Sequence, residues 1–169
     1  MKNVRHLLVV MLAVASMLGV ASPAASASAG SGPIPGIHYI RPAHAPNKCV
    51  TVHGWDTSTR AKIDQWTCHG QQNQRWNFIH NKFFRHLVKS ESSNKCLDGG
   101  DLKKGRKVIQ WPCHSRINQA WHVVPRGKNT YEIHVGVSCL DVEGGSKHNG
   151  ARLILWNCND RANQRFYLN

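Results

Sequence analysis

The side chains best suited to ligand chemistry form two clusters, and the later cluster combines an acid, an indole and two amides. Its members are Asp141, Trp156, Asn159 and Asn163. An ionised carboxylate accepts hydrogen bonds from two neighbouring hydroxyl groups, and an amide both donates and accepts. A flat indole packs against an apolar C–H face. These groups together suit a neutral, hydroxyl-rich ligand such as a sugar.

The earlier cluster repeats this order of residue types. It consists of Asp98, Trp111, His114 and Asn118. Asp98 and Trp111 are 13 residues apart, whereas Asp141 and Trp156 are 15 residues apart. Because two residues are missing from the intervening loop, we expect the earlier cluster to form the shallower pocket.

A third cluster near the start of the domain lacks the acid. It consists of Thr51, Trp66, His69 and Asn73. A threonine hydroxyl cannot replace a charged acceptor that has two oxygens. We therefore predict a degenerate site that binds weakly or not at all.

A structural interpretation of these residues competes with the ligand-binding one. Asp98 and Asp141 precede the glycine pairs Gly99–Gly100 and Gly144–Gly145, where an aspartate can brace a turn. The tryptophans can also fill hairpins as ordinary strand residues. Recurrence of the whole set in two clusters favours ligand binding.

The clusters recur because the chain repeats with a period of 45 residues. Glutamine and aromatic pairs follow this step: Gln74/Trp76, Gln119/Trp121 and Gln164/Phe166. The same step relates Trp66, Trp111 and Trp156, and Cys68, Cys113 and Cys158. Self-similarity at this period indicates three copies of one unit, which assemble to bury a shared core.

Six cysteines fall as one pair in each repeat. The pairs are Cys49/Cys68, Cys96/Cys113 and Cys139/Cys158. Six cysteines allow 15 pairings, but equivalence of the repeats favours a disulfide within each unit. Zinc is the alternative, because Cys68–His69 and Cys113–His114 are adjacent pairs. No C-x-x-C or H-x-x-x-H spacing accompanies them, so we predict no metal and no cofactor.

Short alternating runs predict strands, and turn residues separate them. The alternation places one set of apolar side chains on a buried face: Trp76, Phe78, Trp121, Val123, Phe166 and Leu168. The period of 3.6 residues that marks an amphipathic helix is not sustained anywhere after residue 36. We predict an all-β barrel with pseudo-threefold symmetry, in which Gln74, Gln119 and Gln164 support the loops.

These motifs resemble the ricin B-chain-type lectin domain, which is a β-trefoil. The resemblance covers residues 37–169 and rests on Cys96-Leu97-Asp98, Cys139-Leu140-Asp141, and Trp-x-Cys followed by Asn-Gln-x-Trp. It implies twelve strands, with the aromatic residues of the Gln-x-Trp motifs in the central core. It also implies a galactose-type or xylose-type ligand.

The resemblance assigns a role to each residue of the later cluster. Asp141 would accept hydrogen bonds from two ring hydroxyls, and Trp156 would stack on the sugar. Asn163 would hold a further hydroxyl, while Asn159 would line the rim.

The chain departs from the family pattern at one helper position. Many family members have glutamine two residues before the stacking aromatic, where this chain has Asp64, Ile109 and Ile154. We expect one hydrogen bond to the sugar to be lost there.

The first residues have the pattern of a secretory signal peptide. Lys2 and Arg5 precede the apolar run 7–20, which is shorter than the ~20 residues that a membrane span needs. We predict a signal peptide over residues 1–29, cleaved after Ala27 or Ala29, and a flexible leader over residues 30–36. Residues 37–169 form the domain, with repeats of about 37–81, 82–126 and 127–169. The expected localisation is extracellular.

A strongly basic charge raises a further possibility. Loss of Lys2 and Arg5 lowers the formal charge from +13 to +11. The densest basic cluster is Lys103, Lys104, Arg106 and Lys107, which a solvated loop or a site for an anionic cell-surface polymer would explain. A nucleic-acid partner is not expected, because no matching motif is present.

Two further function classes fit this sequence less well. A trefoil can serve as a scaffold for a protein partner, as a protease inhibitor or a toxin-associated subunit. An enzyme is not expected, because Asp98 and Asp141 belong to different repeats and the histidines lack a nucleophile beside them. The leading interpretation is a monomeric, secreted, carbohydrate-binding module.

Overall fold

A computed structural model describes residues 35–81 and 85–169. These residues contain twelve strands: β1 (Gly36–Pro42), β2 (Lys48–Val52), β3 (Ile63–Thr67), β4 (Arg75–Asn81), β5 (Arg85–Ser90), β6 (Cys96–Asp98), β7 (Ile109–Trp111), β8 (His122–Pro125), β9 (Tyr131–Val135), β10 (Ser138–Val142), β11 (Leu153–Asn157) and β12 (Arg165–Leu168). They also contain five 3-10 helices: η1 (His53–Trp55), η2 (Gln72–Gln74), η3 (Ile117–Gln119), η4 (Glu143–Gly145) and η5 (Ala162–Gln164). The predicted signal peptide, residues 1–29, and residues 30–34 of the predicted leader lie outside the described part of the chain.

Six strands close a barrel, two from each repeat. β1 pairs with β4 and β12, β4 with β5, and β9 with β8 and β12. His86 of β5 and Trp121 complete the ring through two backbone hydrogen bonds of 2.7 and 3.0 Å. Where β1 meets β12, the Tyr39 amide donates to the Asn169 carbonyl at 2.7 Å.

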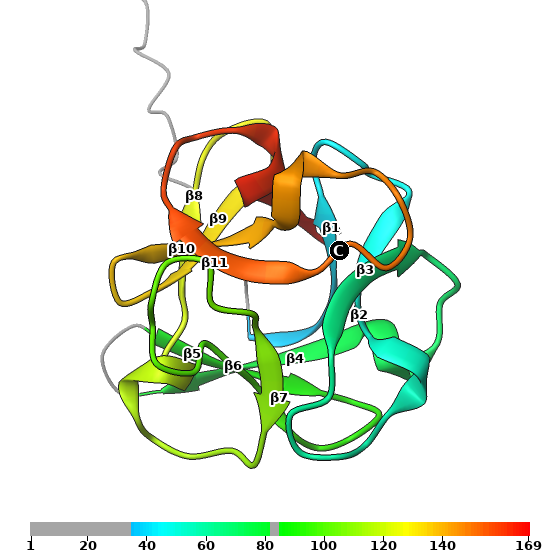
Figure 1. The fold of residues 1–169 in the computed structure, drawn as a ribbon, viewed down its shortest axis with the longest axis vertical. Helices are drawn as coiled ribbons and strands as arrows, with labels where there is room; N and C mark the ends of the chain where they lie inside the picture. Colours follow the sequence, from blue (N-terminus) through cyan, green and yellow to red (C-terminus); the bar gives the residue numbers. More distant parts are fainter. Residues whose placement is uncertain (1–34, 82–84) are drawn as a thin grey trace, which may run out of the picture.

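The other six strands form three antiparallel hairpins, β2–β3, β6–β7 and β10–β11. Figure 1 shows the hairpins arranged round a common centre, with one hairpin in each repeat. Four strands per repeat give the β-trefoil. The predicted all-β fold with pseudo-threefold symmetry is confirmed.

The predicted aromatic core is present. Trp76, Phe78, Trp121 and Phe166 are fully buried, while Val123 and Leu168 are partly buried against them. Each indole keeps a hydrogen-bond partner: Trp76 Nε1 donates to the Val50 carbonyl and Trp121 Nε1 to the Leu97 carbonyl, both at 2.9 Å. These bonds fix Trp76 and Trp121 to the first strand of the hairpin in their own repeat.

The cysteines form one disulfide within each repeat, as repeat equivalence predicts. The bonds are Cys49–Cys68, Cys96–Cys113 and Cys139–Cys158. Each disulfide joins the first strand of a hairpin to the segment that follows the second strand. Each repeat therefore closes its own loop.

The three glutamines that are 45 residues apart, Gln74, Gln119 and Gln164, hold the loops in place, as predicted. Each Oε1 accepts a backbone N–H five residues earlier at 2.9 Å, from His69, His114 and Asn159. Each Nε2 donates to the side chain at the first-strand position: Thr51 at 3.0 Å, Asp98 at 2.9 Å and Asp141 at 2.7 Å. The glutamine thus links the disulfide loop to the position where a ligand-binding acid is expected.

Candidate functional site

The third repeat forms a cleft of about 430 Å³. It is lined by Gly105, Asp141, Glu143, Gly144, Gly145, Ile154, Trp156, Asn159, Arg161 and Asn163. The hairpin supplies Asp141 from β10 and Trp156 from β11, while η5 supplies Asn163. The structure therefore brings together all four residues of the later cluster.

Asp141 is the buried acid of this cleft. Gln164 Nε2 donates to its Oδ2 at 2.7 Å. Burial raises the pKa of the Asp141 carboxyl, and the hydrogen bond from Gln164 opposes part of that rise. A poorly solvated carboxylate gains more from additional hydrogen-bond donors than an exposed one does. Hydroxyl groups of a ligand would supply such donors.

Trp156 forms one wall of the cleft and is 37% exposed. Lys104, from the second repeat, places its Nζ 4.3 Å from the centre of the indole ring, which is cation–π geometry. The neighbouring residue Gly105 also lines the cleft. The loop of the second repeat is therefore part of the third-repeat site, which the sequence repeats did not indicate.

The two asparagines differ in their roles. Asn163 Nδ2 donates to the Val142 carbonyl at 3.2 Å, which orients the amide at the cleft. Asn159 Oδ1 accepts from the Arg161 backbone N–H at 3.0 Å and so shapes the rim. Gly145, at a backbone φ of 62°, lies 3.9 Å from Asn163 when a Cβ is placed on it. The positive φ favours glycine at this position, and the absence of a side chain leaves the adjoining part of the cleft open.

The acid of the second repeat is already occupied by hydrogen bonds within the protein. Asp98 accepts from the Gly100 backbone N–H at 2.7 Å. Asn118 Nδ2 lies 2.9 and 3.0 Å from its two oxygens, and Gln119 Nε2 donates at 2.9 Å. His114 Nε2 lies 3.5 Å away. The structure brings Asp98, His114 and Asn118 together, but their geometry favours the turn-bracing interpretation.

The first repeat forms a cleft of about 290 Å³ without an acid in its lining. It is lined by Thr51, His53, Gly54, Trp55, Trp66, His69 and Asn73. Thr51 is buried, and its hydroxyl donates to the Cys49 carbonyl at 2.7 Å. Asn73 Nδ2 donates to the Val52 carbonyl at 3.1 Å. The four residues of the predicted degenerate site meet, but they offer no ionised acceptor to a ligand.

Trp55 is a lining residue that sequence reasoning missed. It is 46% exposed and adopts a backbone φ of 61°, where the third repeat has Gly145 at a φ of 62°. A bulky residue in this left-handed region is uncommon and is strained. The signal was present in the sequence, because Trp55 lies four residues after Thr51 just as Gly145 lies four residues after Asp141.

Asp64, at the helper position of the first repeat, is not available to that cleft. It is buried, and its Oδ2 lies 2.7 Å from His53 Nδ1 and 3.0 Å from Lys62 Nζ. In the third repeat the equivalent residue, Ile154, lines the cleft with an apolar surface. Neither residue offers the side-chain amide that many family members have there.

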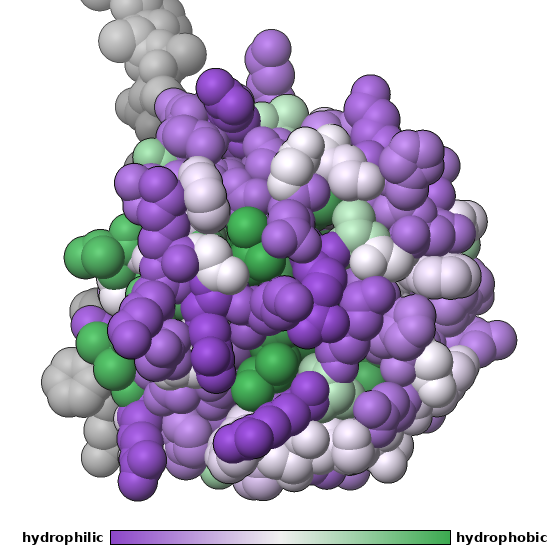
Figure 2. All heavy atoms as spheres, viewed as in Figure 1, coloured by the Kyte–Doolittle hydropathy of each residue, from purple (hydrophilic) through white to green (hydrophobic). Residues whose placement is uncertain are grey.

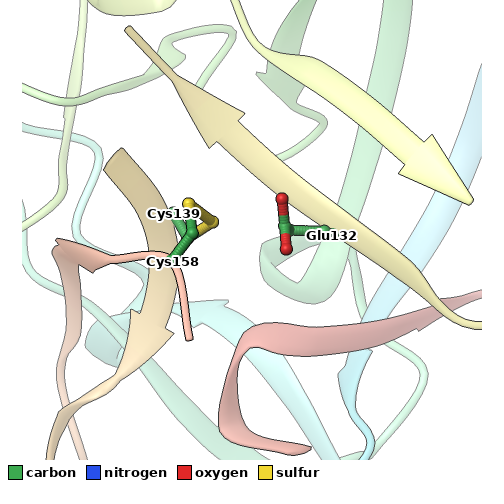
Figure 3. A group of neighbouring side chains, drawn as sticks. All are labelled: Glu132, Cys139 and Cys158. Atoms are coloured by element: carbon green, nitrogen blue, oxygen red, sulfur yellow. A yellow bond between two sulfur atoms is a disulfide. The ribbon is translucent and has the colours of Figure 1, made fainter. Parts of the chain in front are cut away.

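One group of potential metal ligands occurs beside the third disulfide. Figure 3 shows Glu132 close to Cys139 and Cys158, which are bonded to each other. A disulfide sulfur is not a thiolate, which is the form that binds metals. Glu132 is also paired with Arg126, whose Nη2 lies 3.0 Å from Oε1. This group does not fit a metal site.

The comparison with protein families agrees with this geometry. A model of the ricin-type beta-trefoil lectin domain matches residues 37–166. The chain belongs to this family. None of the curated proteins compared with this lectin chain matches it.

Solved structures share the fold of this lectin chain. A designed threefold-symmetric protein, ThreeFoil, has a TM-score of 0.76 at 26% identity, covering 78% of this chain and 96% of its own. A Macrolepiota procera ricin B-like lectin in complex with lactose has a TM-score of 0.69 at 21% identity, covering 83% and 96%. An exo-beta-1,3-galactanase from Clostridium thermocellum has a TM-score of 0.75 at 23% identity, covering 82% of this chain but 31% of the galactanase.

No helix in residues 35–81 and 85–169 of this lectin chain is both long and apolar enough to cross a membrane.

Proposed function

We propose that the chain is a secreted, carbohydrate-binding lectin whose third-repeat cleft holds a galactose-type or xylose-type sugar. The observation that carries this proposal is the meeting of Asp141, Trp156 and Asn163 in one open cleft. In the second repeat the corresponding acid is engaged by Gly100, Asn118 and Gln119 instead. We therefore assign sugar binding chiefly to the third repeat.

The chemistry of the cleft supports a sugar as the ligand. The Asp141 carboxylate, which burial leaves poorly solvated, would accept two adjacent hydroxyl groups. Trp156 would pack against the C–H face of the ring, and Asn163 would bind a further hydroxyl. The lactose bound to the Macrolepiota procera lectin motivates the galactose-type part of the proposal.

A single cleft of this kind binds weakly. An affinity near ~1 mM corresponds to about −4 kcal/mol. Retention on a polysaccharide would require a second contact on the same polymer, because linked weak contacts raise the overall affinity. Polysaccharides are therefore better test ligands than free monosaccharides.

The test compares two tryptophans at equivalent positions of different repeats. Trp156 and Trp66 are 37% and 39% exposed, but an acid accompanies only Trp156 in its cleft. We expect Trp156→Ala to abolish retardation in galactan or xylan affinity gels and Trp66→Ala to leave it nearly unchanged. A glycan array on the wild-type protein identifies the sugar. Unretarded wild-type protein in every gel, together with an array without signal, would reject the proposal.

Competition with free sugar separates the lectin from a protein-binding scaffold. Free sugar should displace a glycan from the cleft but leave a protein partner bound to the loops. The secreted state is tested by the N-terminal residue of the exported protein, which should follow Ala27 or Ala29.

A further inference from the structure

Three basic side chains ring the pseudo-threefold axis on the face formed by the hairpins. Lys62, Lys107 and Arg152 are 45 residues apart and occupy the same place in the three hairpins. Each forms a backbone bridge to the next hairpin, with Ile109, Ile154 and Asp64 respectively. The bridges close a triangle, so the three basic side chains belong to one surface.

Part of this ring borders a recess of about 440 Å³, which we call the axial recess. It is lined by Arg60, Gly105, Arg106, Lys107, Ile109 and Arg152. The lining therefore consists of four basic side chains from three hairpins, a glycine and an isoleucine. Figure 2, in the view of Figure 1, shows a largely hydrophilic surface with a few apolar side chains between the three hairpins.

The charges at this recess are only partly neutralised by the protein. Lys62 is committed to Asp64 at 3.0 Å, and Arg106 Nε lies 3.6 Å from the exposed Asp101. Lys107 and Arg152 form no side-chain ion pair or hydrogen bond with the rest of the described chain. Arg152 Nε is buried without a partner. Because that atom is closed to solvent, an acceptor from outside the protein would bind Lys107 and the remainder of the Arg152 guanidinium, which line the recess.

We propose that the axial recess binds the oxyanions of an acidic polysaccharide. Guanidinium groups hold a carboxylate, sulfate or phosphate through paired hydrogen bonds, and a lysine adds a point charge. The apolar surface of Ile109 and the bare backbone of Gly105 leave room for the ring that carries the anion. The axial recess differs from the Asp141 cleft in its ligand, because it binds an anionic group whereas the cleft binds a neutral sugar.

The position of Gly105 also joins the two surfaces. Gly105 lines both the axial recess and the third-repeat cleft, and the adjacent Lys104 lies over the Trp156 ring. One polymer can therefore place a neutral sugar in the cleft and an acidic residue at the axis. This last step rests on the proposed function, whereas the anion site itself does not.

The experiment compares two triple variants that remove the same charge. The axial variant is Arg60→Gln, Arg106→Gln and Lys107→Gln, and the control variant is Arg116→Gln, Lys128→Gln and Lys147→Gln. All six residues are exposed, and each set contains one residue with a positive backbone φ, Arg60 or Lys128. Thermal unfolding of both variants checks that the fold is intact.

Binding is measured by calorimetry at 0.15 M salt with dextran sulfate, polygalacturonate and neutral dextran. We expect the axial variant to bind the anionic polymers roughly tenfold more weakly, the size expected for three exposed charge contacts, and the control variant to change much less. The sulfate and carboxylate arms show which oxyanion is preferred. Equal losses in the two variants, or wild-type binding of neither anionic polymer, would overturn the proposal.

A galactan gel keeps this proposal distinct from the sugar site. The axial variant should still be retarded in neutral galactan, whereas Trp156→Ala should lose that retardation yet bind dextran sulfate. A wild-type protein that binds dextran sulfate but is not retarded in galactan would count against the proposed lectin site and leave the axial recess standing.

Discussion

Replacing each site aspartate by asparagine should separate a ligand-binding acid from a structural one. Asp141→Asn and Asp98→Asn keep the side-chain shape but remove the charge and one acceptor. Asp141 receives a hydrogen bond from Gln164 and faces an open cleft. Asp98 receives hydrogen bonds from Gly100, Asn118 and Gln119. We expect the first change to affect binding and the second to affect stability.

The magnitudes follow from these contacts. Hydrogen bonds to a charged group contribute about 1.5–3 kcal/mol, so loss of ~2 kcal/mol at Asp141 weakens sugar binding roughly 30-fold. Starting near ~1 mM, that loss makes binding to a single sugar undetectable. At Asp98, asparagine leaves buried donors without an acceptor, at a cost of about 2 kcal/mol, which lowers Tm by roughly 6 °C.

Galactan or xylan affinity gels measure the first effect, and thermal unfolding followed by circular dichroism measures the second. Asp141→Asn should lose retardation with Tm changed by less than about 3 °C. Asp98→Asn should keep most of its retardation at a temperature where it is folded. The opposite pattern, with binding lost at Asp98 and stability lost at Asp141, would refute the reasoning.

Three further predictions concern pH and the disulfides. Because burial raises the pKa of Asp141, sugar affinity should fall as acidification protonates this carboxyl. The ligand-free protein should gain stability over the same pH range, because the folded form binds the proton at a higher pH than the unfolded form does. Titration calorimetry at a series of pH values measures the affinity. Burial lowers the pKa of His86 and His134, so the stability that this shift contributes is present above pH 6.5, the ordinary histidine pKa, and should be lost as the pH falls below it. His86→Asn should flatten that dependence in urea unfolding curves. Removing the Cys96–Cys113 disulfide by a double serine substitution should cost about 3 kcal/mol of unfolding free energy, and a Tm within 2 °C of wild type would contradict it.

The fold was predictable because the period of 45 residues marks positions that the barrel needs in every repeat. Trp76 and Trp121 fill the core, and Gln74 and its equivalents tie each disulfide loop to its hairpin. These contacts lie within one repeat and recur in the others, so the repeat pattern of the sequence predicts them. The strands and the disulfide pairing follow from the same pattern.

The difference between the two acids was less accessible from sequence. Asp98 and Asp141 occupy equivalent positions, but Gly100 and Asn118 donate to Asp98, whereas the Asn163 amide donates to the Val142 carbonyl. Which acceptor each asparagine binds depends on side-chain rotamers and on the conformation of the shorter second hairpin. Residue types alone do not determine that acceptor.

Contacts between repeats were also missed. The partnership of Lys104 with Trp156 and the ring of Lys62, Lys107 and Arg152 depend on the assembly of three hairpins, so no single repeat reveals them. The basic residues of the ring do follow the period of 45. Comparison of charged positions across repeats would have suggested the ring.

The pairing of β1 with β12 has a practical consequence for engineering. Tyr39 and Asn169 exchange backbone hydrogen bonds at 2.7 and 3.4 Å, so the two ends of the domain are neighbours. A short linker can join them, and new termini can be opened at the exposed turn around Gly127 and Lys128. A circular permutant made this way should retain every disulfide, because none of them spans the cut. The architecture therefore does not require that any particular repeat come first along the polypeptide.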